Sequence, residues 1–362
     1  MAHKNESLAP AGEAGQGERG RGEGASTSRA SFEQGLRRTW QQRGAAARLL
    51  WPVSLVYGAL ARHQQARARK NAQRLPVPVI VVGNVIAGGA GKTPTTLAIA
   101  QHLQAHGWRV GIISRGHGRA TRDCREVLPD STPQDAGDEP LLLRRRSGCP
   151  VFVAERRADA GRALLAAHPQ TNLLICDDGL QHAALARDVD ICAFDARGTG
   201  NGWLLPAGPL REPWPRPVDF ILLTEEGAAP PPAAPAPVFR ATRRLAGFGQ
   251  RADGAQIPLA SLRGLPACAT CGIARPESFF EMLQARGVRL QHTHALPDHG
   301  SFEALPAQLL RADVLLCTEK DAAKLWPLAP PAIAVPLVLD IPAEFFAALD
   351  AKLAALGCAQ HA

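Results

Sequence analysis

A glycine-rich loop followed by lysine and threonine carries the clearest chemical signal in the sequence. It lies between a β-rich run, residues 77–82, and a segment with helical spacing, residues 93–106. Backbone N–H groups of such a loop can surround phosphate oxygens at a helix N-terminus. Lys92 would then reach the β- and γ-phosphates, and the Thr93 hydroxyl would bind Mg²⁺. The pattern predicts a site for ATP and Mg²⁺ formed by Gly88, Gly89, Ala90, Gly91, Lys92, Thr93 and Pro94.

The loop is a variant of the usual phosphate-binding pattern. That pattern has glycine six residues before the lysine, where this chain has Ile86. A guanine-specific site would need Lys and Asp separated by one residue, but Lys320 and Asp321 are adjacent, so GTP is disfavoured. The partitioning ATPases that act at membranes or nucleoids carry a lysine just ahead of the glycines, where this chain has Ala87. A membrane-surface ATPase switch without a lipid acceptor remains the second hypothesis.

Phosphoryl transfer also needs an acidic residue at the end of a neighbouring strand to hold magnesium. The apolar run at residues 173–176 is followed by Asp177 and Asp178, which fits that requirement. Apolar strands that end in aspartate are common, so an ordinary strand end is the alternative explanation. Together with the loop at Lys92, the run favours a magnesium site.

The elements that must hold these residues alternate between strands and helices. Short β-rich runs at residues 109–113, 151–154, 173–176, 189–194 and 220–224 predict an α/β fold with a mostly parallel, P-loop NTPase-like sheet. Parallel sheets place ligands at the carboxyl ends of their strands. We assign residues 76–226 to this kinase domain, 227–240 to a proline-rich connection, and 241–362 to a second, smaller α/β domain.

The N-terminal part of the chain has a different composition. Residues 1–31 have almost no large apolar side chains and predict a disordered tail, and residues 32–75 predict an amphipathic, membrane-associating segment. Within it, residues 49–60 are apolar, carry Trp51 and Tyr57, and precede several basic residues. Such a segment can lie on an anionic leaflet or pack as a helix on the protein core. No apolar run reaches the ~20 residues that span a bilayer, and no secretory signal is recognisable, so a cytoplasmic location is expected.

The net charge of +8 favours an anionic partner, which by charge alone is a nucleic acid, a membrane or a phosphorylated substrate.

Nine short motifs in a fixed order make the chain similar to a known family. They are GN (83–84), GGAGKTP (88–94), SRGHGR (114–119), GDEP (137–140), DDGLQH (177–182), PAGPLREP (206–213), CGIARPESFF (271–280), PDHGSF (297–302) and TEKDA (318–322). From residue 49 to the C-terminus the chain resembles the tetraacyldisaccharide 4′-kinases of lipid A synthesis. The resemblance implies transfer of the ATP γ-phosphate to the 4′-hydroxyl of an acylated disaccharide 1-phosphate. It implies no nucleic-acid or protein partner, and it places the enzyme peripherally on the inner face of the cytoplasmic membrane.

The resemblance also implies roles for individual residues. Asp138 would accept the proton of the sugar hydroxyl, with His299 as its partner, while Thr93, Glu139 and Asp177 would hold the metal. Composition alone favours a helix N-cap for Asp138, and the alternative for His299 is a loop histidine. Substrate-binding or supporting roles would fall to Asp178, Gln181, His182, Arg115, Arg119, Arg211 and Glu212.

Two positions depart from the family pattern. His117 stands where the family usually has tyrosine, and Gly300 where it has a bulkier residue or a second histidine. Both substitutions concern the sugar pocket and leave the loop and the proposed pair of Asp138 and His299 unchanged.

Overall fold

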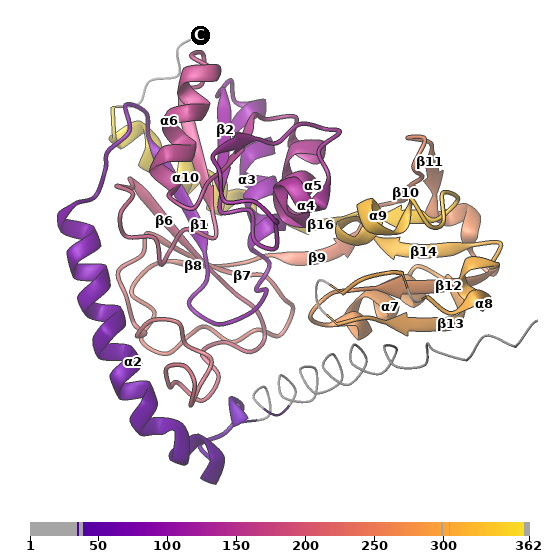
Figure 1. Cartoon of the computed structure of the whole chain (residues 1–362), viewed down its shortest axis with the longest axis horizontal. Helices are drawn as coiled ribbons and strands as arrows, with labels where there is room; N and C mark the ends of the chain where they lie inside the picture. The colour runs from indigo at the N-terminus through magenta and orange to yellow at the C-terminus, as the bar shows by residue number, and fades with distance from the viewer. Residues whose placement is uncertain (1–34, 36–38, 298–299, 304, 358–362) are drawn as a thin grey trace, which may run out of the picture.

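The chain forms two α/β units, each built around its own sheet, with one long helix along the outer side of the first unit (Figure 1). The structure is a computed structural model that describes residue 35 and residues 39–297, 300–303 and 305–357. Its mostly parallel sheets confirm the fold class predicted from the alternating strands and helices.

The first sheet has eight strands, and all of its neighbouring pairs are parallel except the edge pair β3–β4. In spatial order it contains β3 (Arg125–Glu126), β4 (Val151–Val153), β2 (Val110–Ser114), β5 (Leu173–Asp177), β1 (Val79–Gly83), β6 (Val189–Phe194), β7 (Phe220–Leu223) and β8 (Val238–Arg240). Strand β1 lies between β5 and β6, so the phosphate loop that follows it and the acidic end of β5 reach the same edge of the sheet.

Helices cover both faces of this sheet because its strands are apolar on both sides. Ile80 and Val82 of β1 face the core formed with α3 (Lys92–Ala105), α5 (Asp138–Ser147) and α10 (Ala343–Ala355). Val79 and Val81 face the opposite core, which includes α6 (Arg157–Ala167). This alternation fixes the register of β1 and therefore the position of the loop after it.

The second unit has a six-stranded mixed sheet. In spatial order it contains β11 (Gln256–Pro258), β10 (Phe248–Gln250), β15 (Ile333–Val335), β14 (Leu315–Thr318), β12 (Pro266–Cys271) and β13 (Arg289–Ala295). The helix α7 (Pro276–Ala285) covers one face, and α8 (Ala307–Leu310) and α9 (Glu319–Leu325) cover the other.

Two short strands link the units. The chain leaves the first unit through β9 (Thr242–Leu245) and returns through β16 (Leu337–Asp340), and these strands pair with each other antiparallel. The C-terminal helix α10 then packs on the first sheet, with Phe345, Leu349 and Leu353 buried in that core. The sequence assigned residues 241–362 to the second domain, whereas α10 packs in the core of the first unit. The apolar spacing of α10 predicts a buried helical face but does not indicate which sheet covers it.

The long helix α2 (Ala45–Lys70) contacts the first unit through small and polar residues. Ser54 Oγ donates to the Leu204 carbonyl at 2.9 Å. Gly58 lies so close to Leu204 that an added Cβ would sit 2.5 Å from its Cδ1. Most of the large apolar side chains of the helix are exposed. Among the described residues, no helix is long and apolar enough to cross a bilayer.

Candidate active site

The phosphate loop joins β1 to α3, and other parts of the first unit hold its backbone in place. Gly88 and Gly91 adopt positive φ values of 90° and 79°, which glycine tolerates best. The guanidinium of Arg197 donates to the carbonyls of Ala87 at 3.1 Å and Gly89 at 2.6 Å. Lys92 is buried at the start of α3. The loop is therefore preorganised, with its lysine at the N-terminal end of a helix.

The unusual Ile86 has a structural explanation. It is fully buried and forms an antiparallel bridge with Leu210, while the Ala87 N–H donates to the Pro209 carbonyl at 2.8 Å. The first part of the loop thus pairs with the segment at residues 206–213. An apolar residue fits this pairing, and glycines with positive φ occur only further on, at 88 and 91.

Asp177 ends β5 beside the loop and is almost completely buried. Thr96 Oγ1 donates to its Oδ1 at 2.8 Å, whereas Oδ2 is buried without a hydrogen bond. Burial, together with the nearby carboxylates of Glu139 and Asp178, raises the pKa of Asp177 to about 7. A buried carboxylate oxygen without a partner, close to two other carboxylates, is chemically suited to a hard cation such as Mg²⁺.

Asp178 lies in the opposite electrostatic environment. Burial alone would raise its pKa, but Lys92, Arg211 and Arg157 together lower it. Its Oδ1 is 3.8 Å from Lys92 Nζ and 3.2 Å from Arg211 Nη1. The residue has a positive φ of 49°, which turns its side chain out of the strand direction toward these cations. Adjacent aspartates in the sequence therefore differ: Asp178 is charged and paired, and Asp177 tends to hold a proton.

Two openings adjoin these residues. The first, which we call the inter-unit cleft, comprises adjoining cavities of about 190 and 400 Å³ between the loop and the second unit. Its walls combine Lys92 and Arg243 with Ile273, Phe279 and Lys320 of the second unit. An apolar wall beside a phosphate-binding loop suits a nucleotide base next to its phosphates.

The second opening, which we call the α2-side cavity, has a volume of about 580 Å³. Its lining among the described residues comes from the first unit and α2, and it includes Tyr57, Arg115, Arg157, Gln181 and His182. Burial and the surrounding arginines lower the pKa of His182 to about 4, so this imidazole is neutral at pH 7. The Arg157 N–H donates to His182 Nε2 at 3.3 Å, which fixes the tautomer of the ring.

A shared wall separates the two openings. His117, Glu139, Asp178 and Arg211 line both the larger cavity of the inter-unit cleft and the α2-side cavity. Arg211 is held there by its side-chain contact with Asp178 and by its carbonyl, which accepts from Tyr57 Oη on α2 at 2.9 Å. A group bound in one opening can therefore meet a group bound in the other at this wall.

The predicted base, Asp138, begins α5 directly after Gly137 and is largely buried. Lys324 Nζ, on α9 of the second unit, donates to its Oδ2 at 2.7 Å. Its predicted partner His299 lies outside the described residues. Lys324 was not among the predicted site residues, because an ion pair between positions 186 residues apart leaves no local pattern in the sequence.

Five of the predicted residues that the structure describes line neither opening: Asp138, Asp177, Ala90, Arg119 and Glu212. Glu212 is buried against Arg216, with Oε1 2.9 Å from Nη1, and it accepts from Gln181 Nε2 at 2.7 Å. Glu212 therefore positions Gln181 and the following segment. The Arg119 side chain is turned into the protein, where burial lowers its pKa and Asp123 lies 3.7 Å away. Ala90, which belongs to the loop, is fully buried.

Comparison with known proteins identifies the family. The model of the tetraacyldisaccharide-1-P 4′-kinase family, LpxK, matches residues 46–354. The chain belongs to this family. A tetraacyldisaccharide 4′-kinase of Acidovorax sp. (strain JS42) is 59% identical over 332 residues, covering 90% of this chain and 96% of that one. The kinase of Delftia acidovorans is 54% identical over 327 residues, covering 89% and 96%.

A solved structure supports the same assignment for the fold. The LpxK of Aquifex aeolicus, crystallised in complex with ATP, superposes with a TM-score of 0.73 at 27% sequence identity. The match covers 84% of this chain and 98% of the Aquifex chain. A member of the LpxK family with this fold therefore binds ATP.

Proposed function

We propose that the chain transfers the γ-phosphate of ATP to the 4′-hydroxyl of a tetraacylated disaccharide 1-phosphate, a lipid A precursor. The shared wall between the two openings is the observation that carries this proposal. ATP would occupy the inter-unit cleft, with its phosphates on the loop and Lys92. The sugar would enter through the α2-side cavity and present its hydroxyl at Glu139, Asp178 and Arg211.

Thr93, Glu139 and Asp177 would hold Mg²⁺ in this site. The buried Asp177 Oδ2 lacks a hydrogen bond, and two further carboxylates lie near it, so the residues fit a divalent cation. When bound, Mg²⁺ supplies positive charge that offsets the charge of the transferring phosphoryl group. Lys92 and Arg211 supply fixed positive charge from the protein on either side of Asp178.

Asp138 acts as the base in the proposed reaction, with His299 as its partner. As the bond from the sugar oxygen to the γ-phosphorus forms, the hydroxyl proton passes to the Asp138 carboxylate. The bond from the γ-phosphorus to the bridging oxygen breaks, and ADP leaves. Lys324 holds one carboxylate oxygen and thereby orients the base, so both units contribute to a competent site.

The α2-side cavity has the chemistry of a phosphosugar site. Arg115, Arg157 and Arg211 supply positive charge, and the neutral His182 and the amide of Gln181 can exchange hydrogen bonds with sugar hydroxyls. All the described residues that line this cavity belong to the first unit and α2. Binding of the acceptor can therefore occur independently of the angle between the two units.

The helix α2 would place this cavity at the inner face of the cytoplasmic membrane. Leu49, Val53, Val56 and Leu60 are between 55% and 81% exposed, and their spacing puts them on one side of the helix. Ser54 and Gly58, which contact the protein, lie on the opposite side. The basic residues Arg67, Arg69 and Lys70 follow in the last turn. An apolar stripe with adjacent basic residues suits an anionic membrane surface.

A phosphate-transfer assay tests the proposed reaction. Purified protein receives γ-labelled ATP and Mg²⁺, with or without tetraacyldisaccharide 1-phosphate in mixed micelles. We expect label in the lipid, with hydrolysis to free phosphate below a tenth of the transfer rate. Equal hydrolysis in the presence and absence of lipid, without labelled lipid, would instead support the membrane-surface ATPase switch.

Liposome co-sedimentation tests the role of α2. The double variant Val53→Glu, Val56→Glu should lose binding to vesicles that contain anionic lipid, because it places two charges on the apolar stripe. The matched control is Ala59→Glu, Ala66→Glu, which adds the same charge at exposed positions outside the stripe and keeps all four large apolar side chains. Equal loss in both variants would show that charge alone explains the effect.

A further inference from the structure

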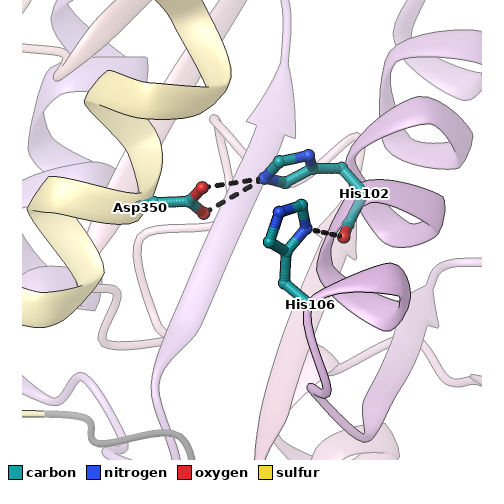
Figure 2. A group of neighbouring side chains, drawn as sticks. All are labelled: His102, His106 and Asp350. Carbon is teal, nitrogen blue, oxygen red and sulfur yellow. Dashed lines mark hydrogen bonds and ion pairs between the residues drawn. The ribbon is translucent and has the colours of Figure 1, made fainter. Parts of the chain in front are cut away.

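Two histidines and an aspartate meet at the far end of the helix that begins with Lys92 (Figure 2). His102 and His106 lie one turn apart near the C-terminal end of α3, and Asp350 lies on the neighbouring α10. His102 Nε2 is 3.0 and 3.2 Å from the two Asp350 oxygens. The three side chains thus connect the helix of the phosphate loop with the last helix of the chain.

The three residues offer ligand atoms that can converge on one ion. One ligand atom from each residue lies within 4.8 Å of the other two. Ligand atoms about 2.0 Å from a tetrahedral zinc ion lie about 3.3 Å from one another. The spacing between His102 and Asp350 is therefore that of two neighbouring ligands, and only His106 needs to move closer. Within the described part of the chain, no other group of three His, Cys, Asp or Glu residues meets this condition.

The orientation of His106 gives separate support. Its Nδ1 is 2.8 Å from the His102 carbonyl oxygen, so Nδ1 carries the proton and donates it. This leaves a lone pair on Nε2, which Figure 2 shows on the side of His102 and Asp350. Metal-binding histidines usually donate their other ring N–H to a carbonyl or carboxylate in this way. The hydrogen bond fixes the tautomer that can bind a metal.

Packing against α10 holds the imidazole of His102 in place, while the rest of the site stays open to solvent. The His102 ring stacks on Phe346 of α10 at 4.1 Å with an interplanar angle of 13°. His106 is exposed, and Asp350 is about one-third exposed. An ion can therefore enter from solvent and keep a water molecule as its fourth ligand.

We propose that His102, His106 and Asp350 form a site for a divalent transition-metal ion of the zinc class. Imidazole ligands favour such ions over Mg²⁺, which prefers oxygen ligands. The site is distinct from the one at Asp177 and Thr93, because His102 lies ten residues beyond Lys92, about 15 Å along the helix. A bound ion would clamp α10 onto α3. The helix α10 follows the strand by which the chain returns from the second unit. The bound ion would therefore stabilise the packing of this last helix on the first unit.

Metal titration of the full-length chain tests this proposal. Metal-free protein is titrated with Co²⁺ without nucleotide and with excess Mg²⁺, so that the oxygen site at Asp177 does not contribute. We expect one Co²⁺ per chain with visible bands of tetrahedral coordination, displacement by Zn²⁺, and a higher melting temperature with Zn²⁺. The His106→Gln and Asp350→Asn variants should each bind at least tenfold more weakly and lose the thermal shift.

The control uses a similar histidine without the third ligand. His168 Nε2 is 2.9 Å from Glu126 Oε1, which reproduces the pair of His102 and Asp350 alone. His168→Gln should bind Co²⁺ like the wild type. His106 is exposed, so its substitution leaves the fold intact, which circular dichroism verifies. Equal affinity of wild type and His106→Gln, or no binding at millimolar Co²⁺, would overturn the proposal and leave an ordinary ion pair between two helices.

Discussion

The two openings of the active site are built in different ways. In the part of the chain that the structure describes, the α2-side cavity is lined by the first unit and α2, whereas the inter-unit cleft has side chains from both units. The units are joined by the paired strands β9 and β16. A change in the angle between the units would therefore alter the cleft and leave the cavity intact. In the proposed reaction, nucleotide binding would depend on closure of the units, whereas acceptor binding would depend on the first unit and α2.

Lys92 lines the inter-unit cleft and lies 3.8 Å from Asp178 of the shared wall, so its removal should have the largest effect. In Lys92→Ala, the γ-phosphate loses a fixed positive charge and Asp178 loses one of its cations. We expect kcat/KM for both ATP and the lipid acceptor to fall by about 10³. Steady-state kinetics with each substrate varied in turn measures this. A fall in kcat/KM for only one of the two substrates would show that Lys92 does not act where the substrates meet.

Arg115 lines only the α2-side cavity, so its removal should separate the two substrates. Arg115→Ala should raise KM for the lipid acceptor by about 10-fold to 10²-fold and leave KM for ATP unchanged. The matched control is Arg122→Ala, since Arg122 is an almost fully exposed arginine of the same segment. If Arg115→Ala weakened ATP binding to the same degree, the division between the openings would be wrong.

Lys320 provides the reverse test from the second unit. It lines the inter-unit cleft and not the α2-side cavity. Lys320→Ala should raise KM for ATP by about tenfold without changing KM for the acceptor. Lys352→Ala is the control, because Lys352 belongs to the first unit and pairs with Asp219 at 2.8 Å. Comparable effects of both lysine variants would indicate a general loss of positive charge.

Asp177 should give the smallest effect, on stability rather than turnover. The folded protein holds the Asp177 proton up to about pH 7, whereas the unfolded chain loses it near the ordinary value of 3.8. The folded state therefore binds the extra proton between these values, and the free energy of unfolding falls as pH rises through this window. Without Mg²⁺ at pH 8, Asp177→Asn should be more stable than wild type by about 1 to 2 kcal/mol. Urea unfolding at pH 5 and pH 8 measures it, and a difference that is the same at both pH values would contradict the account.

Local sequence patterns predicted the phosphate side of the site. The loop, Lys92 and Asp177 follow strands whose β-rich runs are visible in the sequence, and a parallel sheet brings the ends of such strands together. The family resemblance added Asp138 and Glu139, for which the local pattern gave only a helix start. Arg115, His182 and Arg211, to which the resemblance gave substrate-binding or supporting roles, all line the α2-side cavity.

Long-range contacts could not be predicted in this way. The bonds from Arg197 to the loop carbonyls and from Lys324 to Asp138 join segments more than 100 residues apart. The strand β9 contains two arginines among its four residues, so its composition did not indicate a strand. Glu212 and Arg119 were predicted near the substrate because they lie in two of the motifs shared with the family, and the side chain of each is buried by contacts that depend on the fold.

Single-turnover phosphate transfer by Asp138→Asn tests the central proposal most directly. The substitution removes the carboxylate that accepts the proton and keeps the size of the side chain. Lys324→Met is the matched control, because it breaks the same ion pair and leaves the carboxylate. We predict that Asp138→Asn lowers the transfer rate to the lipid by about 10² or more with ATP affinity unchanged, and that Lys324→Met has a smaller effect. Transfer by Asp138→Asn at a rate close to that of the wild type would contradict the role of Asp138 as the base.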